Sequence, residues 1–296
     1  MKTKDIQIRD PFILKVDGKY FLYGSTDKDI WRDSIPTGFD TYVSDDLQNW
    51  DGPYEAFRPS KHFWGTKNFW APEVHEYNDA YYMFATFYSD THNRGTAILK
   101  SETPFGPFEE WSDGAVTPKD WMSLDGTLYI DKEDKPWIVF CHEWVQIQDG
   151  TICAMQLSED LKSAVGEPIV LFKSSDVSWS EQVESKSNNI TGFVTDGCNF
   201  RRLQNGKLIM VWSCIGKDGY CIGYHVSDND EITGQWKEGE LIFSKDGGHG
   251  MIFTTYEGEI MLAIHQPNQT PNERAHFYKL IETEDGFTLS GDAPLC

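Results

Sequence analysis

The sequence is poor in basic residues: 26 lysines and arginines stand against 47 aspartates and glutamates, which gives a formal net charge of −21 at pH 7. This charge disfavours binding to nucleic acid or to an anionic membrane surface, because both carry negative charge. A net negative charge is compatible with a neutral or cationic ligand, and it can also serve solubility alone. We therefore expect neither nucleic acid nor membrane among the partners, and the sequence leaves the oligomeric state open.

Long apolar runs and paired cysteines are also absent. No stretch approaches the roughly 20 apolar residues that span a bilayer, and residues 1–5 contain no apolar segment of the signal-peptide kind. The sequence as given therefore predicts a cytoplasmic protein, or a secreted or periplasmic one if a leader precedes it. The six cysteines show no CxxC spacing, which argues against a zinc site.

What the sequence does contain is a recurring pattern of short strands. Its clearest copy is residues 9–23, where Asp17-Gly18 separates two apolar and aromatic runs, a strong hairpin signal. A third strand is expected at residues 39–44. Pro11 lacks an amide hydrogen and should hold Asp10 in an extended conformation, which defines the start of the first strand.

Five such units follow one another along the chain, opening near residues 10, 73, 125, 196 and 249. Helical patterning is absent, and repeated units of this size can bury their sheet faces by packing around a ring. The sequence thus predicts an all-β fold, a five-bladed β-propeller that occupies residues 1–296 as one domain. The polar segment 174–189 is predicted to be a long surface loop, with a disordered linker as the alternative.

In a propeller the first strand of each blade lines the central channel, so the strand starts should converge at its mouth. We expect five ionisable residues there: Asp10, Glu73, Asp125, Asp196 and His249. Crowded carboxylates raise one another's pKa, and two carboxylates with separated pKa values are what cleavage of a glycosidic bond requires. The alternative is that these side chains only bond backbone amides at strand ends.

The order of these residues resembles glycoside hydrolase family 43. The resemblance extends from Asp10 to Leu280, and it rests on four motifs: Arg9-Asp10-Pro11, Trp70-Ala71-Pro72-Glu73, Leu124-Asp125-Gly126 and Gly248-His249-Gly250. It implies a five-bladed propeller that acts on plant polysaccharides. Invertase-like families share the Arg-Asp-Pro motif, but their Asn-Asp-Pro and Cys-Pro contexts do not occur here at the catalytic positions.

The resemblance also implies roles for individual residues. Asp10 matches the general base, and Asp125 matches the residue that orients the general acid and tunes its pKa. The family usually has a glutamate before Gly-Pro at the acid position, whereas this chain has Asp196 before Gly197-Cys198. The side chain is shorter by one methylene, so Glu143 is the alternative acid.

The remaining expectations concern ligands. His249 matches a family histidine that often binds calcium through water, so we expect a structural Ca²⁺ there and no organic cofactor. The residues expected to contact carbohydrate are Phe12, Trp70, Glu73, Glu143 and His249. The expected activity is inverting and exo-acting, of the α-L-arabinofuranosidase or β-xylosidase type. A non-catalytic carbohydrate-binding propeller, which would keep the aromatic mouth and lack the acid, is the alternative.

Overall fold

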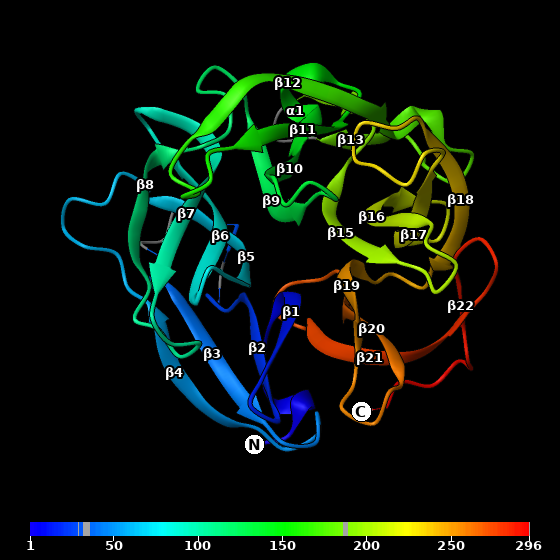
Figure 1. Ribbon diagram of the computed structural model, residues 1–296, viewed down its shortest axis with the longest axis horizontal. Coiled ribbons are helices and arrows are strands. Elements are labelled where there is room, and N and C mark those ends of the chain that lie inside the picture. The colour runs from blue at the N-terminus through cyan, green and yellow to red at the C-terminus, as the bar shows by residue number, and fades with distance from the viewer. Residues whose placement is uncertain (29, 32–35, 186–188, 296) are drawn as a thin grey trace.

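The computed structural model describes all residues except 29, 32–35, 186–188 and 296. Five four-stranded antiparallel sheets stand around a central axis, which confirms the predicted five-bladed propeller (Figure 1). Each sheet consists of four strands that are consecutive in the sequence. No helix of the described chain is long and apolar enough to cross a membrane.

The bounds of the strands follow the predicted units closely. Blade 1 consists of β1 (Arg9–Val16), β2 (Lys19–Ser25), β3 (Phe39–Ser44) and β4 (Asp51–Phe57), and blade 2 of β5 (Lys67–Tyr77), β6 (Ala80–Ser89), β7 (His92–Ser101) and β8 (Glu109–Ala115). Blade 3 consists of β9 (Ser123–Ile130), β10 (Pro136–His142), β11 (Thr151–Leu157) and β12 (Ala164–Lys173). Blade 4 consists of β15 (Asp196–Arg202), β16 (Leu208–Gly216), β17 (Gly219–Ser227) and β18 (Trp236–Phe243), and blade 5 of β19 (Gly248–Thr254), β20 (Ile260–Gln266), β21 (Arg274–Glu282) and β22 (Phe287–Leu289).

A few short elements lie outside the blades. They are the 3₁₀ turns η1 (Thr3–Asp5) and η2 (Ser174–Asp176), the single-turn helix α1 (Trp144–Ile147), and the strands β13 (Val183–Ser185) and β14 (Ile190–Gly192). The prediction of a long surface loop over 174–189 was therefore wrong in part, because the segment also contains regular secondary structure. This segment contains η2 and β13, and β13 pairs antiparallel with β14 beyond the predicted loop. Residues 186–188 of the predicted loop lie outside the described part of the chain.

Each blade has a β-bulge at the same place, where its first strand enters the channel. The strand pairing shifts register there in all five blades. The residues that begin the bulges have left-handed backbone conformations: Asp10 (φ 55°), Ala71 (φ 45°), Asp125 (φ 56°), Gly197 (φ 38°) and His249 (φ 44°). The expectation that Pro11 keeps Asp10 extended was therefore wrong, because the bulge determines the backbone conformation at this position.

The bulges are also where neighbouring blades are hydrogen-bonded to each other. In each blade the amide of the bulge residue donates to a side chain of the preceding blade: Asp10 to His265 Nδ1 (3.1 Å), Ala71 to Ser25 Oγ (2.8 Å), Asp125 to Thr86 Oγ1 (2.9 Å), Gly197 to Asp125 Oδ2 (3.0 Å) and His249 to Ser213 Oγ (2.8 Å). These five bonds form a ring around the channel mouth. They fix the backbone from which the central side chains project.

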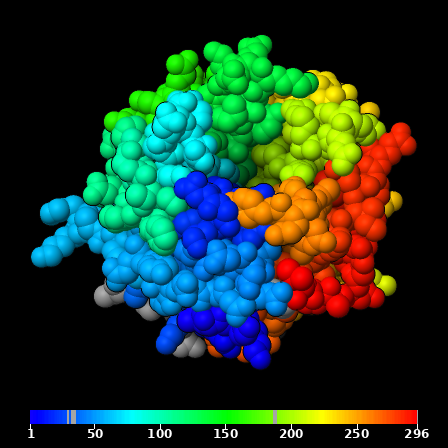
Figure 2. Space-filling view, turned by 60° about the horizontal axis from the view of Figure 1, so that its bottom comes forward, coloured from blue at the N-terminus to red at the C-terminus, as the bar shows by residue number. Residues whose placement is uncertain are grey.

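The ring closes by contacts between blade 1 and blade 5. Arg9 Nη1 lies 3.0 Å from Oε1 of the fully buried Glu273, and the Ile8 amide donates to the Glu273 carbonyl at 3.4 Å. Figure 2 shows the blue N-terminal residues against the orange and red residues of the last blade. Because each blade is built from consecutive strands, the closure depends on packing and on individual hydrogen bonds rather than on a shared sheet.

Aromatic side chains fill the space between blades. Five phenylalanines, Phe39, Phe57, Phe63, Phe69 and Phe87, form one such cluster between blades 1 and 2, with contacting ring centroids 4.8–6.1 Å apart. All five side chains are buried. Tilted and edge-on packing of this kind adds to the hydrophobic stabilisation that large buried rings provide.

Candidate active site

A cavity of about 910 Å³ lies at the channel mouth and is lined by residues of all five blades. Its lining includes Asp10 from blade 1, Trp70 and Arg94 from blade 2, Asp125 and Glu143 from blade 3, Asp196 and Tyr220 from blade 4, and His249 from blade 5. The volume is within the range of small-molecule and oligosaccharide-sized sites. The predicted residues Asp10, Asp125, Asp196 and His249 are therefore brought together, although they span most of the chain.

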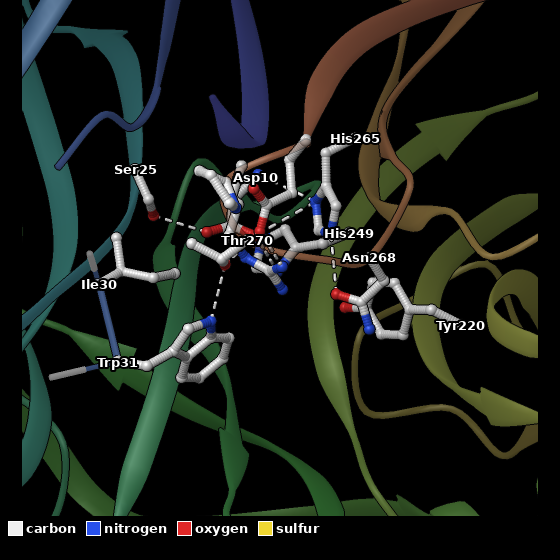
Figure 3. A network of polar contacts seen from close by, with 12 residues as sticks. Asp10, Ser25, Ile30, Trp31, Tyr220, His249, His265, Asn268 and Thr270 are labelled. Carbon is white, nitrogen blue, oxygen red and sulfur yellow. Dashed lines mark hydrogen bonds and ion pairs between the residues drawn. The ribbon is translucent and has the colours of Figure 1, made fainter. Parts of the chain in front are cut away.

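Asp10 is a buried carboxylate held by polar contacts on both of its oxygens (Figure 3). Oδ2 accepts a hydrogen bond from Ser25 Oγ at 2.6 Å, and Oδ1 lies 3.3 Å from His249 Nδ1. Burial by itself would raise the pKa of Asp10, but the charges of His249 and Arg9 outweigh it and hold that pKa below its ordinary value. Asp10 is therefore suited to remain ionised.

The environment of Asp125 shifts its pKa in the opposite direction. Its Oδ2 accepts the Gly197 amide at 3.0 Å and lies 3.6 Å from His249 Nδ1. Burial, and next to it the negative charge of Asp10, raise the pKa of Asp125 well above its ordinary value. Two buried carboxylates close to each other cannot both ionise at low cost, so Asp125 is suited to carry a proton while Asp10 is ionised.

Asp196 lies one residue before the bulge residue of blade 4, and its carboxylate accepts a hydrogen bond from the Tyr220 hydroxyl at 3.0 Å. Burial and the neighbouring Asp125 raise the pKa of Asp196 to about 7. The cavity thus contains one carboxylate suited to be ionised and another suited to carry a proton near neutral pH. That separation is the requirement for general base and general acid roles in one site.

Tyr220 and His265 support these two carboxylates, and Tyr220 was missed in the sequence. The Tyr220 ring stacks on His265, with centroids 5.4 Å apart and an interplanar angle of 24°. Because His265 Nδ1 accepts the Asp10 amide, the imidazole must carry its proton on Nε2, which lies 3.3 Å from Asn268 Oδ1. Burial, together with Arg9, lowers the pKa of His265 well below its ordinary value, so this ring is neutral.

Glu143, the alternative acid, lines the cavity but is already ion-paired. Its Oε2 accepts a hydrogen bond from Arg94 Nη1, and Arg94 Nη2 also donates to Asn68 Oδ1 at 3.1 Å. The Arg94 guanidinium lies 4.5 Å from the centroid of the Trp70 ring. Burial raises the pKa of Glu143, although the charge of Arg94 opposes the shift. The charge of Arg94 favours the ionised form of Glu143, whereas a general acid must carry a proton before it acts.

Two residues predicted to contact carbohydrate lie elsewhere. Phe12 is buried against His75, with ring centroids 5.1 Å apart, and Glu73 Oε2 lies 3.1 Å from His75 Nε2. Neither is among the described residues that line the cavity. Their predicted place at the channel mouth was wrong. Phe12 and Glu73 each lie two residues after the bulge residue of their blade, and Glu73 is not at a strand start, because β5 begins six residues before it. Trp70, by contrast, lies in the lining as expected.

The predicted calcium site has one candidate ligand, His249. Within the described residues, no group of three or more His, Cys, Asp or Glu side chains could hold a metal ion directly. His249 Nδ1 faces Asp10 and Asp125 at 3.3 and 3.6 Å. An ion at this place would have to keep most of its water ligands, which is a property of Ca²⁺ sites with few protein oxygens. The ligand role of His249 stays a prediction.

Sequence comparison identifies the family. Residues 4–288 match the sequence pattern of glycosyl hydrolases family 43. The chain belongs to this family. This confirms the resemblance predicted from the motifs, and with it the assignment of the protein as a glycoside hydrolase.

Known relatives of this family-43 chain include proteins that act on arabinan. The crystal structure of an endo-arabinase from Bacteroides thetaiotaomicron VPI-5482 superimposes with a TM-score of 0.90 at 39% identity, covering 97% of this chain and 99% of that chain. A thermostable family-43 glycoside hydrolase has a TM-score of 0.79 at 23% identity, covering 97% of this chain and 94% of that one, which supports the fold alone. The extracellular endo-α-(1→5)-L-arabinanase 1 of Bacillus subtilis is 23% identical over 153 residues, 48% of this chain and 45% of that protein. The matched region thus spans less than half of that relative.

Proposed function

We propose that this family-43 enzyme hydrolyses α-1,5-linked L-arabinan with inversion of anomeric configuration. The observation that carries the proposal is the pair Asp10 and Asp196 in one cavity, the first with a pKa held below its ordinary value and the second with a pKa of about 7. The choice of arabinan draws on the 39% identity to the Bacteroides endo-arabinase.

In the proposed mechanism Asp10 removes a proton from a water molecule, which attacks the anomeric carbon. Asp196 donates its proton to the departing glycosidic oxygen from the opposite face of the sugar. Asp125 accepts the amide of Gly197, the residue that follows Asp196, and so fixes the backbone beside the general acid, while burial and the nearness of Asp125 raise the pKa of Asp196. The inverting route requires room for the water, so the two reacting carboxyl groups should be about 6.5–9.5 Å apart.

The motifs led us to expect an exo-acting arabinofuranosidase or β-xylosidase, whereas the relatives named endo-arabinase and endo-arabinanase favour internal cleavage. We therefore propose endo action. Chromatography of early products from linear arabinan tests this choice. Endo action gives a mixture of oligosaccharides and a rapid fall in viscosity, while exo action releases a single small sugar and leaves the viscosity high.

Two further measurements test the reaction itself. Proton NMR of the first-formed products should show the anomer opposite to that of the substrate, and retained configuration would contradict the assigned roles. A substrate panel of arabinan, xylan, galactan and the matching aryl glycosides tests the sugar. Binding of a polysaccharide without release of sugar from any of them would support the non-catalytic propeller instead.

A further inference from the structure

A second cavity, of about 760 Å³, lies on blade 2 beside the active-site cavity. It lies between the segment that joins β4 to β5, the turn from β6 to β7, the strand β8 and the loop that follows it. The segment between β4 and β5 projects from the rim of the disc, light blue in Figures 1 and 2. The volume of this second cavity is also typical of ligand sites, and the mechanism proposed above makes no use of it.

One residue, Tyr88, lines both cavities. On the active-site side, the guanidinium of Arg94 lies 5.9 Å from the Tyr88 ring centroid and 4.5 Å from that of Trp70. Trp70 in turn contacts the exposed Trp31, with ring centroids 5.3 Å apart. Aromatic and guanidinium faces therefore form a continuous row from the active-site cavity to the ridge at Tyr88.

A second group of rings, Trp64 and His92, lines the second cavity together with Tyr88. The ring centroid of the half-buried Trp64 lies 5.5 Å from that of His92. Trp64 also packs against the aromatic core, with its centroid 5.9 Å from that of Phe87. His92 Nδ1 is fixed by Thr91 Oγ1 at 3.0 Å, and Asn93 Nδ2 donates to the Lys119 carbonyl at 3.1 Å across the cavity. These bonds order the walls without a ligand, and such preorganisation lowers the entropic cost of binding.

The chemistry of the lining selects for a neutral ligand rich in hydroxyl groups. Among the described residues, four carboxylates and one lysine line this cavity: Asp90, Glu110, Asp113, Asp120 and Lys119. Carboxylates accept hydrogen bonds from hydroxyl groups and repel acidic polymers. Trp64 and Tyr88 offer flat apolar faces, on which the C–H faces of sugar rings can pack.

We propose that the second cavity is an accessory binding site for a neutral polysaccharide chain, which extends from the active site across Tyr88 towards Trp64. The proposal rests on the proposed function for the identity of the sugar, linear arabinan. It assigns Trp64 and His92 to binding of the distal part of the chain. They take no part in the chemistry.

The first test compares Trp64→Ala with Trp111→Ala. Trp111 is a matched control, because it is a half-buried tryptophan of the same blade that lines neither cavity and donates to the Asp160 carbonyl. Loss of one aromatic stacking contact should raise the KM for linear arabinan about 2- to 10-fold. The kcat, and the kinetics on a short arabino-oligosaccharide, should stay as in the wild type. Equal KM values for both variants and the wild type would overturn the proposal.

The second test does not depend on Trp64, whose removal could disturb the core. His62 and His92 are exposed residues that line the second cavity, so the double variant His62→Ala/His92→Ala should fold. In an Asp10→Asn background, which leaves the polymer intact, gel electrophoresis through soluble arabinan should show weaker retardation of this variant. Undiminished retardation, or equal retardation by polygalacturonate, would overturn the proposal.

These outcomes separate the accessory site from the proposed function. If the wild type hydrolyses no arabinan, the proposed function fails. Retardation by another neutral polysaccharide that depends on His62, Trp64 and His92 would then still support the accessory site. If no polysaccharide retards the protein, the accessory site is overturned even where arabinan hydrolysis is measured.

Discussion

The hydroxyl of Tyr220 donates a hydrogen bond to Asp196 Oδ2 at 3.0 Å, while its ring stacks on His265, whose Nδ1 accepts the amide of Asp10. One tyrosine therefore contacts the residue assigned as general acid and the histidine that fixes the residue assigned as general base. Because Asp196 is shorter than the usual glutamate, a donor that fixes its orientation has particular value at this position.

Replacing Tyr220 by phenylalanine should move the alkaline limb of the pH profile. The hydroxyl stabilises the ionised form of Asp196, so its removal raises the pKa of Asp196 further above 3.8. A general acid loses activity as the pH rises through its pKa, and the alkaline limb of kcat/KM should therefore shift to higher pH. Tyr224→Phe, on the same strand but outside the cavity, is the control. A limb that stays in place or moves to lower pH would contradict the assignment of Asp196.

Asp10→Asn should abolish most activity and leave the fold intact. Asparagine is nearly isosteric and tolerates the left-handed backbone of this position, where φ is 55°. The amide cannot accept the proton from water, so kcat should fall about 10²- to 10⁴-fold, equally for good and poor leaving groups. Circular dichroism and thermal unfolding control for the fold. A loss confined to poor leaving groups would show that Asp10 is not the base.

Asp196→Ala and Glu143→Ala should differ in how their effects depend on the leaving group. Without its general acid, the enzyme should show a kcat on arabinan that is lower by about 10²- to 10⁴-fold. The loss on aryl arabinosides should be far smaller, because their leaving groups depart without protonation. Glu143→Ala removes the partner of Arg94, and we expect a higher KM from a misplaced guanidinium, with no dependence on the leaving group. If the dependence appears only in Glu143→Ala, Glu143 is the acid and the assignment of Asp196 was wrong.

Glu273→Ala should lower the free energy of unfolding by about 3–5 kcal/mol, because it leaves the buried Arg9 charge without its partner. Urea denaturation followed by tryptophan fluorescence measures the change. Asp45→Ala removes the partner of Lys19 in an exposed ion pair and serves as the control, with little expected effect. Similar losses in both variants would argue against a special role for the contact between blades 1 and 5.

Removal of bound metal tests the calcium prediction. If a hydrated Ca²⁺ is bound through His249, dialysis against a chelator should lower the thermal midpoint of the wild type, and added Ca²⁺ should restore it. His249→Ala should show neither effect. Metal analysis that finds no calcium, together with an unchanged midpoint after dialysis, would contradict the prediction.

The strands were predictable because their signals are local. The predicted third strand at residues 39–44 coincides with β3, and the Asp17-Gly18 turn joins β1 to β2 as expected. Each unit has alternating apolar residues between turn residues, and five units of that kind can bury their faces by packing around a ring. The recurring pattern of strands therefore predicts the propeller, even where the amino acids at matching positions differ between units.

The alignment of the units at the channel was less predictable, since it depends on the bulges. Asp10, Asp125 and His249 begin their bulges, but in blade 2 that position is Ala71 and in blade 4 it is Gly197. Glu73 lies two residues after the bulge residue of its blade, whereas Asp196 lies one residue before the bulge residue of its blade. Tyr220 and Arg94 come from third strands and follow no motif, so only the folded chain reveals that they contact Asp196 and Glu143.

The ring of hydrogen bonds that the backbone amides donate at the bulges has a consequence for biosynthesis. The amide of Asp10 is held by a residue 255 positions later in the chain, in the last blade to leave the ribosome. Until blade 5 is made and packed against β1, the amide of Asp10 lacks this acceptor, and its carboxylate lacks the neighbouring imidazoles of His249 and His265. A nascent chain that lacks blade 5 therefore cannot hold the residue proposed as general base in the orientation that it has in the complete propeller. Under the proposed mechanism, catalytic competence therefore requires that blade 5 has packed against blade 1.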